Sequence, residues 1–314
     1  MSAIGVAAWT EESMPDLSDR VAVVTGANSG LGLETARMLA ARGAEVVMAC
    51  RNPEKAAVAA TRIRELVPDA RLSFVLLDTS SLESVRQAAE AIRMRVPRLD
   101  LLINNAGAAR KHRELSPDGF EMTFAANHLG HFALTGLLAD RLAILGARVV
   151  TVTSWAHLRG AIDFDDLHFE HRPYQRMTAY TQSKLANMLF AQELQRRLGD
   201  NATISVAAHP GAVFTNFVAN MPFPRVGQWL AARRGRQRFL TRTNTVEVGA
   251  LSTVRAAVDP EVRGGELYGP RAVSTGHPVR VEYRERAGAA QTRARLWAVS
   301  EQLTGVRFPC APGA

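Results

Sequence analysis

The chain has 314 residues, enough for one large α/β domain or two small ones with a sizeable core. Its formal net charge is +8, but the basic residues are spread along the chain instead of forming the stripe or tail typical of nucleic-acid binders, so no nucleic-acid partner is expected. No apolar run reaches the roughly 18 residues of a membrane span. The apolar patch at 4–9 lacks the basic segment that precedes the apolar core of a signal peptide. We therefore expect a cytoplasmic protein.

Short β-branched runs alternate with amphipathic stretches from residue 21 onward. We expect strands at 21–25, 45–49, 72–77, 99–103, 148–153 and 203–208, and helices at 31–42, from 53 onward, and at 82–95, 118–138 and 180–198. Such alternation indicates βαβ units and a parallel sheet. The strands are almost entirely apolar, as expected when both sheet faces are covered. The sequence therefore predicts a single α/β domain of Rossmann type, a doubly wound parallel sheet with helices on both faces.

The pattern changes after Gly211. Residues 216–243 are irregular and rich in Phe, Pro, Trp and Arg, and we then expect a helix at 246–258, a short strand at 266–268 and a last helix at 289–303. We interpret 1–18 as an N-terminal leader, 19–305 as the domain, 212–243 as a C-terminal substrate lid, and 306–314 as a tail. The two cysteines, Cys50 and Cys310, cannot build a disulfide framework.

A glycine-rich turn, TGANSGLG at 25–32, joins the first strand to the first helix. Glycines in that place allow a tight turn and let the backbone approach a pyrophosphate at the helix N-terminus. The turn predicts a dinucleotide site formed by Gly26, Asn28, Ser29, Gly30, Leu31 and Gly32.

The residues at the end of the second strand should determine whether the cofactor is NAD or NADP. Dinucleotide-binding folds that use NAD place an acid there, whereas a nearby arginine accommodates the 2′-phosphate of NADP. The segment at the end of this strand, 48–52, reads MACRN. It contains no acid, and Arg51 and Asn52 are its last two residues. We therefore expect NADP(H), although a solvated arginine capping the turn would also fit Arg51.

Tyr180 and Lys184 open the helix expected at 180–198. Residues four apart share a helix face, so the phenol and the ammonium should lie side by side. A nearby cation favours the phenolate, which would lower the pKa of Tyr180 and suit it to proton transfer. Lys184 is one of only three lysines, with Lys55 and Lys111, in an arginine-rich chain.

Other polar residues follow strands at the sheet edge where ligands of open α/β sheets bind. Ser154 follows the strand at 148–153 and could hydrogen-bond a substrate oxygen, or simply cap the next turn. NNAG at 104–107 ends the strand before it. Asn127 stands in an apolar helix, where an amide is unfavourable unless it is bonded.

These motifs resemble the short-chain dehydrogenase/reductase family. TGANSGLG, NNAG, Asn127, Ser154, YTQSK and HPG occur in the order of that family over roughly residues 18–305. ACR after the second strand, LLDTSS at 76–81, NHLGHF at 127–132 and SKLANMLF at 183–190 are most similar to the branch of retinol dehydrogenases, WW-domain oxidoreductases and protochlorophyllide reductases.

The resemblance implies a role for each residue. Tyr180 would be the general acid/base and Lys184 would bind the nicotinamide ribose, while Ser154 would polarise the carbonyl. Asn127 would hold a water of a proton relay. The rest of the cofactor cleft would comprise Asp78 and Thr79 beside the adenine, the loop residues Asn105, Ala106 and Gly107, and Pro210, Gly211, Val213 and Thr215 at the carboxamide.

The resemblance also guides the expected function. The segment 156–178, between Ser154 and Tyr180, and the lid should enclose a bulky, mostly apolar substrate, with lid residues Phe214, Phe217, Met221, Phe223, Trp229, Leu230 and Phe239. Arginines 233, 234, 236 and 238 could meet an anionic group. We expect an NADP(H)-dependent ketoreductase of specialised metabolism that needs no metal. The alternatives are an NAD-dependent alcohol dehydrogenase of the same fold and a non-catalytic cofactor-binding scaffold. Because members of the family often pair through the Tyr-bearing helix and its neighbour, we expect a homodimer.

Overall fold

The computed structural model describes residues 8–142, 146–199, 202–213, 243–283 and 288–308. Its strands form one 8-stranded sheet of order β3-β2-β1-β4-β5-β6-β7-β8. The strands are β1 (Val21–Thr25), β2 (Glu45–Cys50), β3 (Leu72–Leu76), β4 (Leu101–Asn104), β5 (Arg148–Val152), β6 (Ile204–Ala208), β7 (Leu267–Pro270) and β8 (Pro278–Val281). Neighbours from β3 to β7 run parallel, and β8 pairs antiparallel with β7. The expected Rossmann-type sheet is confirmed, with β8 as an unexpected edge strand.

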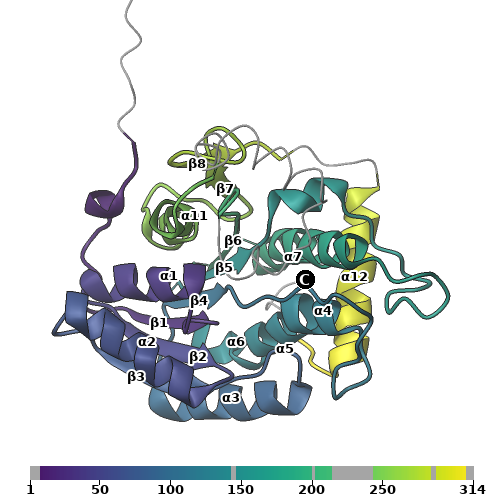
Figure 1. The fold of residues 1–314 in the computed structure, drawn as a ribbon, viewed down its shortest axis with the longest axis horizontal. Coiled ribbons are helices and arrows are strands. Elements are labelled where there is room, and N and C mark those ends of the chain that lie inside the picture. The colour runs from purple at the N-terminus through teal and green to yellow at the C-terminus, as the bar shows by residue number, and fades with distance from the viewer. Residues whose placement is uncertain (1–7, 143–145, 200–201, 214–242, 284–287, 309–314) are drawn as a thin grey trace, which may run out of the picture.

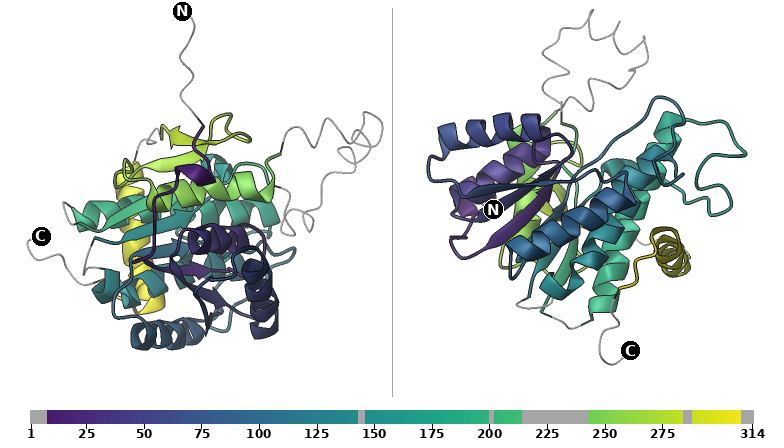
Figure 2. Two further views of the ribbon diagram at one scale, coloured as in Figure 1. Left: turned by 90° about the vertical axis from the view of Figure 1, so that its left-hand side faces the viewer. Right: turned by 90° about the horizontal axis from the view of Figure 1, so that it is seen from below.

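Helices cover both faces of this sheet (Figures 1 and 2). On one face lie α1 (Gly30–Ala41), α2 (Pro53–Leu66) and α11 (Val246–Val258), and on the other α3 (Leu82–Arg95), α5 (Gly130–Leu137) and α7 (Arg176–Leu198). The remaining helical elements are η1 (Glu11–Ser13), α4 (Met122–Phe124), η2 (Ala125–Leu129), α6 (Ala139–Leu142), η3 (Trp155–Arg159) and α12 (Ala289–Thr304). None of the helices in the described ranges has both the length and the apolar character that a membrane crossing requires.

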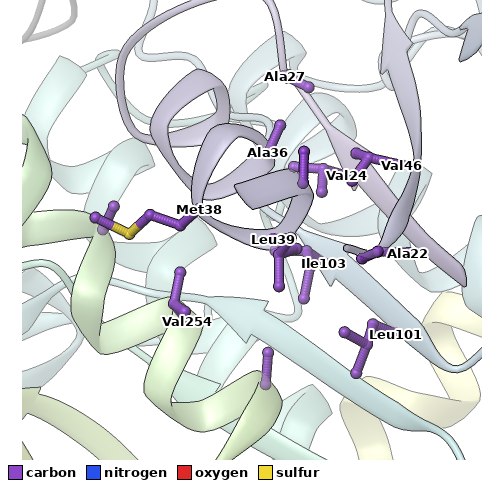
Figure 3. Packing of buried hydrophobic residues seen from close by; sticks show 14 of the residues in the cluster. Ala22, Val24, Ala27, Ala36, Met38, Leu39, Val46, Leu101, Ile103 and Val254 are labelled. Atoms are coloured by element: carbon purple, nitrogen blue, oxygen red, sulfur yellow. The ribbon is translucent and has the colours of Figure 1, made fainter. Parts of the chain in front are cut away.

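The first face packs around the two central strands. Val24 of β1 lies beside Ile103 of β4, and Leu39 of α1 and Val254 of α11 close over them (Figure 3). All four side chains are fully buried. Burying such a side chain contributes about 1.5–3 kcal/mol, so this core holds the strand ends that carry the cleft in fixed positions.

Helix α12 lies across α7 and α5 on the second face (Figure 1). Its Trp297 is 2% exposed and packs against Phe132 and Phe190, at ring-centroid distances of 5.0 and 5.9 Å. This is the face on which a partner subunit was expected. A homodimer there stays a prediction, and the partner would have to share the face with α12. Part of the expected tail also belongs to this core, because Phe308 lies 4.5 Å from Trp297 between ring centroids.

The helix expected at 118–138 starts later and is irregular. Asp118 lies in a turn, and its carboxylate accepts a hydrogen bond from the main-chain N–H of Leu82, the first residue of α3. Glu121 then caps α4, and η2 is a π-helical turn that carries Asn127. Helix α7 starts at Arg176, one turn before the expected Tyr180. The lid expected at 212–243 lies outside the described residues except for its two ends.

Candidate active site

A cleft of about 870 Å³ runs along the carboxyl ends of the parallel strands. Nearly all residues predicted for the site line it: Gly26, Asn28, Ser29, Gly30, Leu31, Gly32, Arg51, Asn52, Asp78, Thr79, Asn105, Ala106, Gly107, Ser154, Tyr180, Lys184, Pro210, Gly211 and Val213. Asn127 is buried behind the wall of the cleft, and Thr215 lies outside the described residues. Segments far apart in the sequence thus meet at one sheet edge, as the strand order requires.

The glycine turn is closely packed against the loop that follows β4. Gly26 adopts a φ of +67°, and a Cβ on Gly32 would lie 2.3 Å from the Gly26 carbonyl oxygen and 2.5 Å from Asn105 Nδ2. A side chain at residue 32 is therefore excluded. Ser29 precedes α1, and its hydroxyl makes no capping hydrogen bond. The N-terminus of α1 thus faces the cleft with its positive dipole end, where an anion would be stabilised.

One end of the cleft is basic. Arg51 follows β2 and is 65% exposed at its side chain, with its Nη1 3.6 Å from a carboxylate oxygen of Asp78. Asn52 caps α2 by accepting a hydrogen bond from Lys55 N. Lys55 also lines the cleft. Lys55 was not predicted as a site residue, although it lies in the first turn of the helix that follows Arg51.

Ser154 and Tyr180 meet in the middle of the cleft. Their hydroxyl groups are hydrogen-bonded to each other. Ser154 Oγ also accepts from Ala156 N at 3.2 Å, so it caps η3 as well as facing Tyr180. Tyr180 lies on the second turn of α7, while Ser154 lies two positions beyond the end of β5. The capping alternative and the functional alternative for Ser154 are therefore compatible.

Burial shifts the pKa values of Tyr180 and Lys184 in opposite directions. It raises the pKa of Tyr180 to about 12, against the opposing effect of the Ser154 hydrogen bond. It lowers the pKa of Lys184 to about 8, because the charged ammonium is poorly solvated. The lowered pKa expected for Tyr180 is wrong for this structure, since the loss of solvent around the phenol outweighs the hydrogen bond with Ser154. At neutral pH the phenol is protonated and the lysine remains mostly charged.

Asn127 uses its whole side chain to hold neighbouring segments together. Its Oδ1 accepts from Ala108 N at 2.7 Å, and its Nδ2 donates to Ala108 O and to Ser183 Oγ at 3.0 and 2.9 Å. Ser183 in turn donates to the main-chain carbonyl of Tyr180. Asn127 therefore joins the loop after β4 to α7. The water-holding role that the resemblance implies stays a prediction.

Apolar side chains line the cleft together with Ser154 and Tyr180. Trp155 follows Ser154 directly and is 38% exposed, while Met177, one turn before Tyr180, is 50% exposed. Met122, Ala126 and Ala156 line the same cleft, and so does the basic residue Arg110. Ala156 and Met177 belong to the segment 156–178 that was expected, with the lid, to enclose the substrate, although only lid residues were named from the sequence. Trp155, Met122 and Ala126 were not predicted as site residues.

A family model, short chain dehydrogenase, matches residues 20–223 of this chain. The chain belongs to the short-chain dehydrogenase family. Its glycine turn, strands β1 to β6 and the Tyr-x-x-x-Lys pair fall within the matched segment.

Named relatives place this short-chain dehydrogenase in the retinol dehydrogenase-like branch. Human retinol dehydrogenase 13 is 36% identical over 300 residues, which are 95% of this chain and 88% of that protein. The WW domain-containing oxidoreductase of Pongo abelii is 36% identical over 307 residues, or 95% of this chain and 71% of that protein. The branch expected from NHLGHF and SKLANMLF is confirmed.

Solved structures share the fold of this short-chain dehydrogenase. The crystal structure of a protein from Mycobacterium paratuberculosis has a TM-score of 0.79 and 40% identity, and covers 96% of this chain and 100% of its own. A short chain dehydrogenase from Burkholderia cenocepacia, solved in complex with NADP, has a TM-score of 0.61 and 25% identity, with 81% and 96% coverage.

Proposed function

We propose that this short-chain dehydrogenase uses NADP(H) to reduce a ketone or aldehyde in a bulky, mostly apolar molecule. The observation that carries the proposal is the shared cleft. Ser154, Tyr180 and Lys184 line its middle, while the glycine turn and two basic side chains line one end. A dinucleotide bound along that cleft would place its nicotinamide ring beside Tyr180, which would be the proton donor.

The residues of the cleft fit a dinucleotide. The glycine turn brings main-chain atoms close to the N-terminus of α1, and no Cβ fits at residue 32. Asp78, Thr79 and the loop at 105–107 would flank the nucleotide, with Pro210, Gly211 and Val213 at the far end. When bound, the nicotinamide would supply the hydride. The NADP complex of the Burkholderia relative supports this cofactor class.

Arg51 and Lys55 support NADP over NAD. Both line the cleft just beyond β2, where an NAD-specific fold would carry an acid. A guanidinium can hold a phosphate through two parallel hydrogen bonds, and an ammonium adds a point charge. The ion pair of Arg51 with Asp78 is long and solvent-exposed, so it contributes little and leaves Arg51 available to a phosphate.

The protonation states support reduction. A buried phenol whose pKa is raised to about 12 carries its proton at neutral pH and can donate it to a carbonyl oxygen as negative charge develops there. Ser154, hydrogen-bonded to the same phenol, would hold the carbonyl oxygen within reach. The ammonium of Lys184 would stabilise the phenolate left after proton transfer.

The substrate class follows from the wall beside these hydroxyls. Trp155 and Met177 keep large apolar areas exposed at the cleft, where apolar rings of a substrate would bury them. Turnover restricted to small polar aldehydes, with no activity on any large ketone, would contradict this part of the proposal.

A cofactor titration tests the proposal directly. Purified protein is titrated with NADPH and with NADH while nicotinamide fluorescence is followed, for wild type, Arg51→Ala and Lys55→Ala. Arg62→Ala is the matched control, because Arg62 is exposed on the same helix as Lys55 and does not line the cleft. We expect wild type and the control to prefer NADPH, and both test variants to lose that preference by about tenfold or more. Equal or tighter NADH binding by wild type would overturn the NADP assignment.

A further inference from the structure

We propose that His131 is a positioning residue of the cofactor cleft: it orients the hydroxyl of Thr25 so that this hydroxyl fixes the loop at 105–106 against the glycine turn. The inference rests on the proposed cofactor site and assigns it a residue that does not line the cleft. His131 lies on α5, beneath the floor of the site.

His131 is 1% exposed and both of its ring nitrogens are bonded. Its Nδ1 lies 2.9 Å from the main-chain oxygen of Asn127, and its Nε2 lies 2.9 Å from Thr25 Oγ1. Asn127 is on the π-helical turn η2, and Thr25 is the last residue of β1 before the glycine turn. One imidazole thus connects the helix layer to the strand that carries the phosphate cradle.

The direction of each hydrogen bond follows from chemistry. A carbonyl oxygen can only accept, so Nδ1 must carry a proton towards Asn127. Burial lowers the pKa of His131 to about 4, so the ring is neutral at pH 7 and has a single N–H. Nε2 is therefore an acceptor, and the hydroxyl of Thr25 donates to it.

The oxygen of Thr25 then has two lone pairs for other donors. Asn105 N and Ala106 N both donate to it, each at 2.9 Å. The alternative acceptor for its proton, the Ile103 carbonyl, is farther away at 3.3 Å. With its proton committed to His131, the hydroxyl makes one donated and two accepted hydrogen bonds, which is its full capacity.

The loop held in this way forms part of the proposed cofactor site. Asn105 Nδ2 donates to the main-chain oxygen of Thr25 at 2.8 Å, and a Cβ on Gly26 would lie 3.1 Å from Ala106 Cα. The loop and the glycine turn therefore pack with no spare room. If the hydroxyl of Thr25 rotated, two main-chain N–H groups would lose their acceptor and the loop would shift relative to the turn.

The test measures binding of NADPH by fluorescence, with thermal unfolding recorded in parallel. The variants are His131→Phe, Thr25→Val, Thr25→Ser and the double variant His131→Phe/Thr25→Val. His128→Phe is the matched control: His128 is also 1% exposed, but its Nε2 pairs with Ser300 Oγ of α12. A merely structural histidine would alter thermal stability in both His→Phe variants and leave the Kd for NADPH unchanged.

We expect His131→Phe and Thr25→Val each to weaken NADPH binding by about tenfold, as for a lost buried hydrogen bond. The double variant should show about tenfold as well, because the two residues act through one interaction. Thr25→Ser, which keeps the hydroxyl, and His128→Phe should stay within about twofold of wild type.

Wild-type affinity in His131→Phe, or equal weakening in His128→Phe, would overturn the inference, as would additive effects in the double variant. If His131→Phe does not fold, the comparison of Thr25→Val with Thr25→Ser decides, and equal affinities for that pair would reject the role of the hydroxyl. Failure of the wild type to bind either NADPH or NADH would instead refute the proposed function, and this inference with it.

Discussion

The ammonium nitrogen of Lys184 lies 5.9 Å from the centre of the Tyr180 ring and donates a hydrogen bond to the main-chain oxygen of Val152 at 3.1 Å. The lysine is thus anchored to the end of β5, the strand that precedes Ser154. A buried ammonium therefore lies beside the ring of a buried phenol whose pKa is raised.

The pH dependence of carbonyl reduction should report Lys184. Its pKa is lowered to about 8 by burial, so its charge is present below that pH and lost above it, whereas Tyr180 stays protonated up to about 12. We expect kcat/KM for reduction to fall about tenfold per unit above pH 8. Lys184→Gln, which can still bond to Val152, should be slower and independent of pH in this range. A wild-type profile that is flat from pH 7 to 10 would contradict the assigned role of Lys184.

Tyr180→Phe should abolish most of the reaction and spare cofactor binding. Loss of the general acid is expected to lower kcat by about a hundredfold or more, while the Kd for NADPH changes by less than about twofold. Tyr268→Phe is the matched control, because Tyr268 is also buried but its hydroxyl bonds to Glu266. Steady-state reduction assays and fluorescence titration measure the two quantities. A Tyr180→Phe enzyme with wild-type kcat would support a non-catalytic role instead.

Trp155→Ala should discriminate between large and small substrates. Removing the indole takes away apolar contact worth about 1.5–3 kcal/mol, so KM for a bulky apolar ketone should rise about tenfold or more while that for a small ketone stays unchanged. Leu158→Ala serves as the control, since Leu158 is 52% exposed on the same element, η3, and does not line the cleft. Equal effects of the two variants would remove Trp155 from the substrate wall.

Gly32→Ala should damage the phosphate cradle. The added methyl would lie 2.3 Å from the carbonyl oxygen of Gly26, so the glycine turn must move. We expect a loss of about 1–3 kcal/mol in the free energy of unfolding, as for other overpacked sites, and at least tenfold weaker binding of NADPH. Thermal denaturation and fluorescence titration provide the measurements. Unchanged affinity would show that the turn has more freedom than its packing indicates.

Buried histidines should make the protein less stable in mild acid. Burial lowers the pKa of His128 to about 3 and of His131 to about 4, from an ordinary 6.5. Below about pH 6.5 the unfolded chain takes up protons that the folded chain cannot, so the stability present at neutral pH is lost as the pH falls towards 4. Each such histidine contributes a slope of about 1.4 kcal/mol per pH unit. Urea unfolding at pH 7, 6 and 5 should show that the free energy of unfolding falls less steeply with decreasing pH in His128→Phe than in wild type.

The sequence alone predicts those features of the fold and site that depend on a short motif with a fixed local geometry. The spacing of four residues between Tyr180 and Lys184 places both on one face of α7. The glycines of the turn are required because the backbone there leaves no room for a side chain. The parallel sheet followed from apolar runs alternating with helices. These features depend on residues close together in the chain.

Features that depend on distant contacts could not be read in the same way. The π-helical turn carries Asn127, whose side chain bonds to Ala108 and to Ser183, 19 and 56 positions away in the sequence. The raised pKa of Tyr180 results from burial, which spacing alone does not reveal. Trp155 resembles an ordinary core residue in the sequence, and only the cleft shows that its ring remains exposed.

The position of α12 also affects the order in which the molecule can be assembled. Phe132 and Phe190 precede Trp297 in the chain, so they are synthesised before the indole that packs against both rings. Until α12 has been made, these two rings on α5 and α7, the helices that also carry His131 and Tyr180, lack that cover. The packing of this layer is therefore completed only after α12 has been translated.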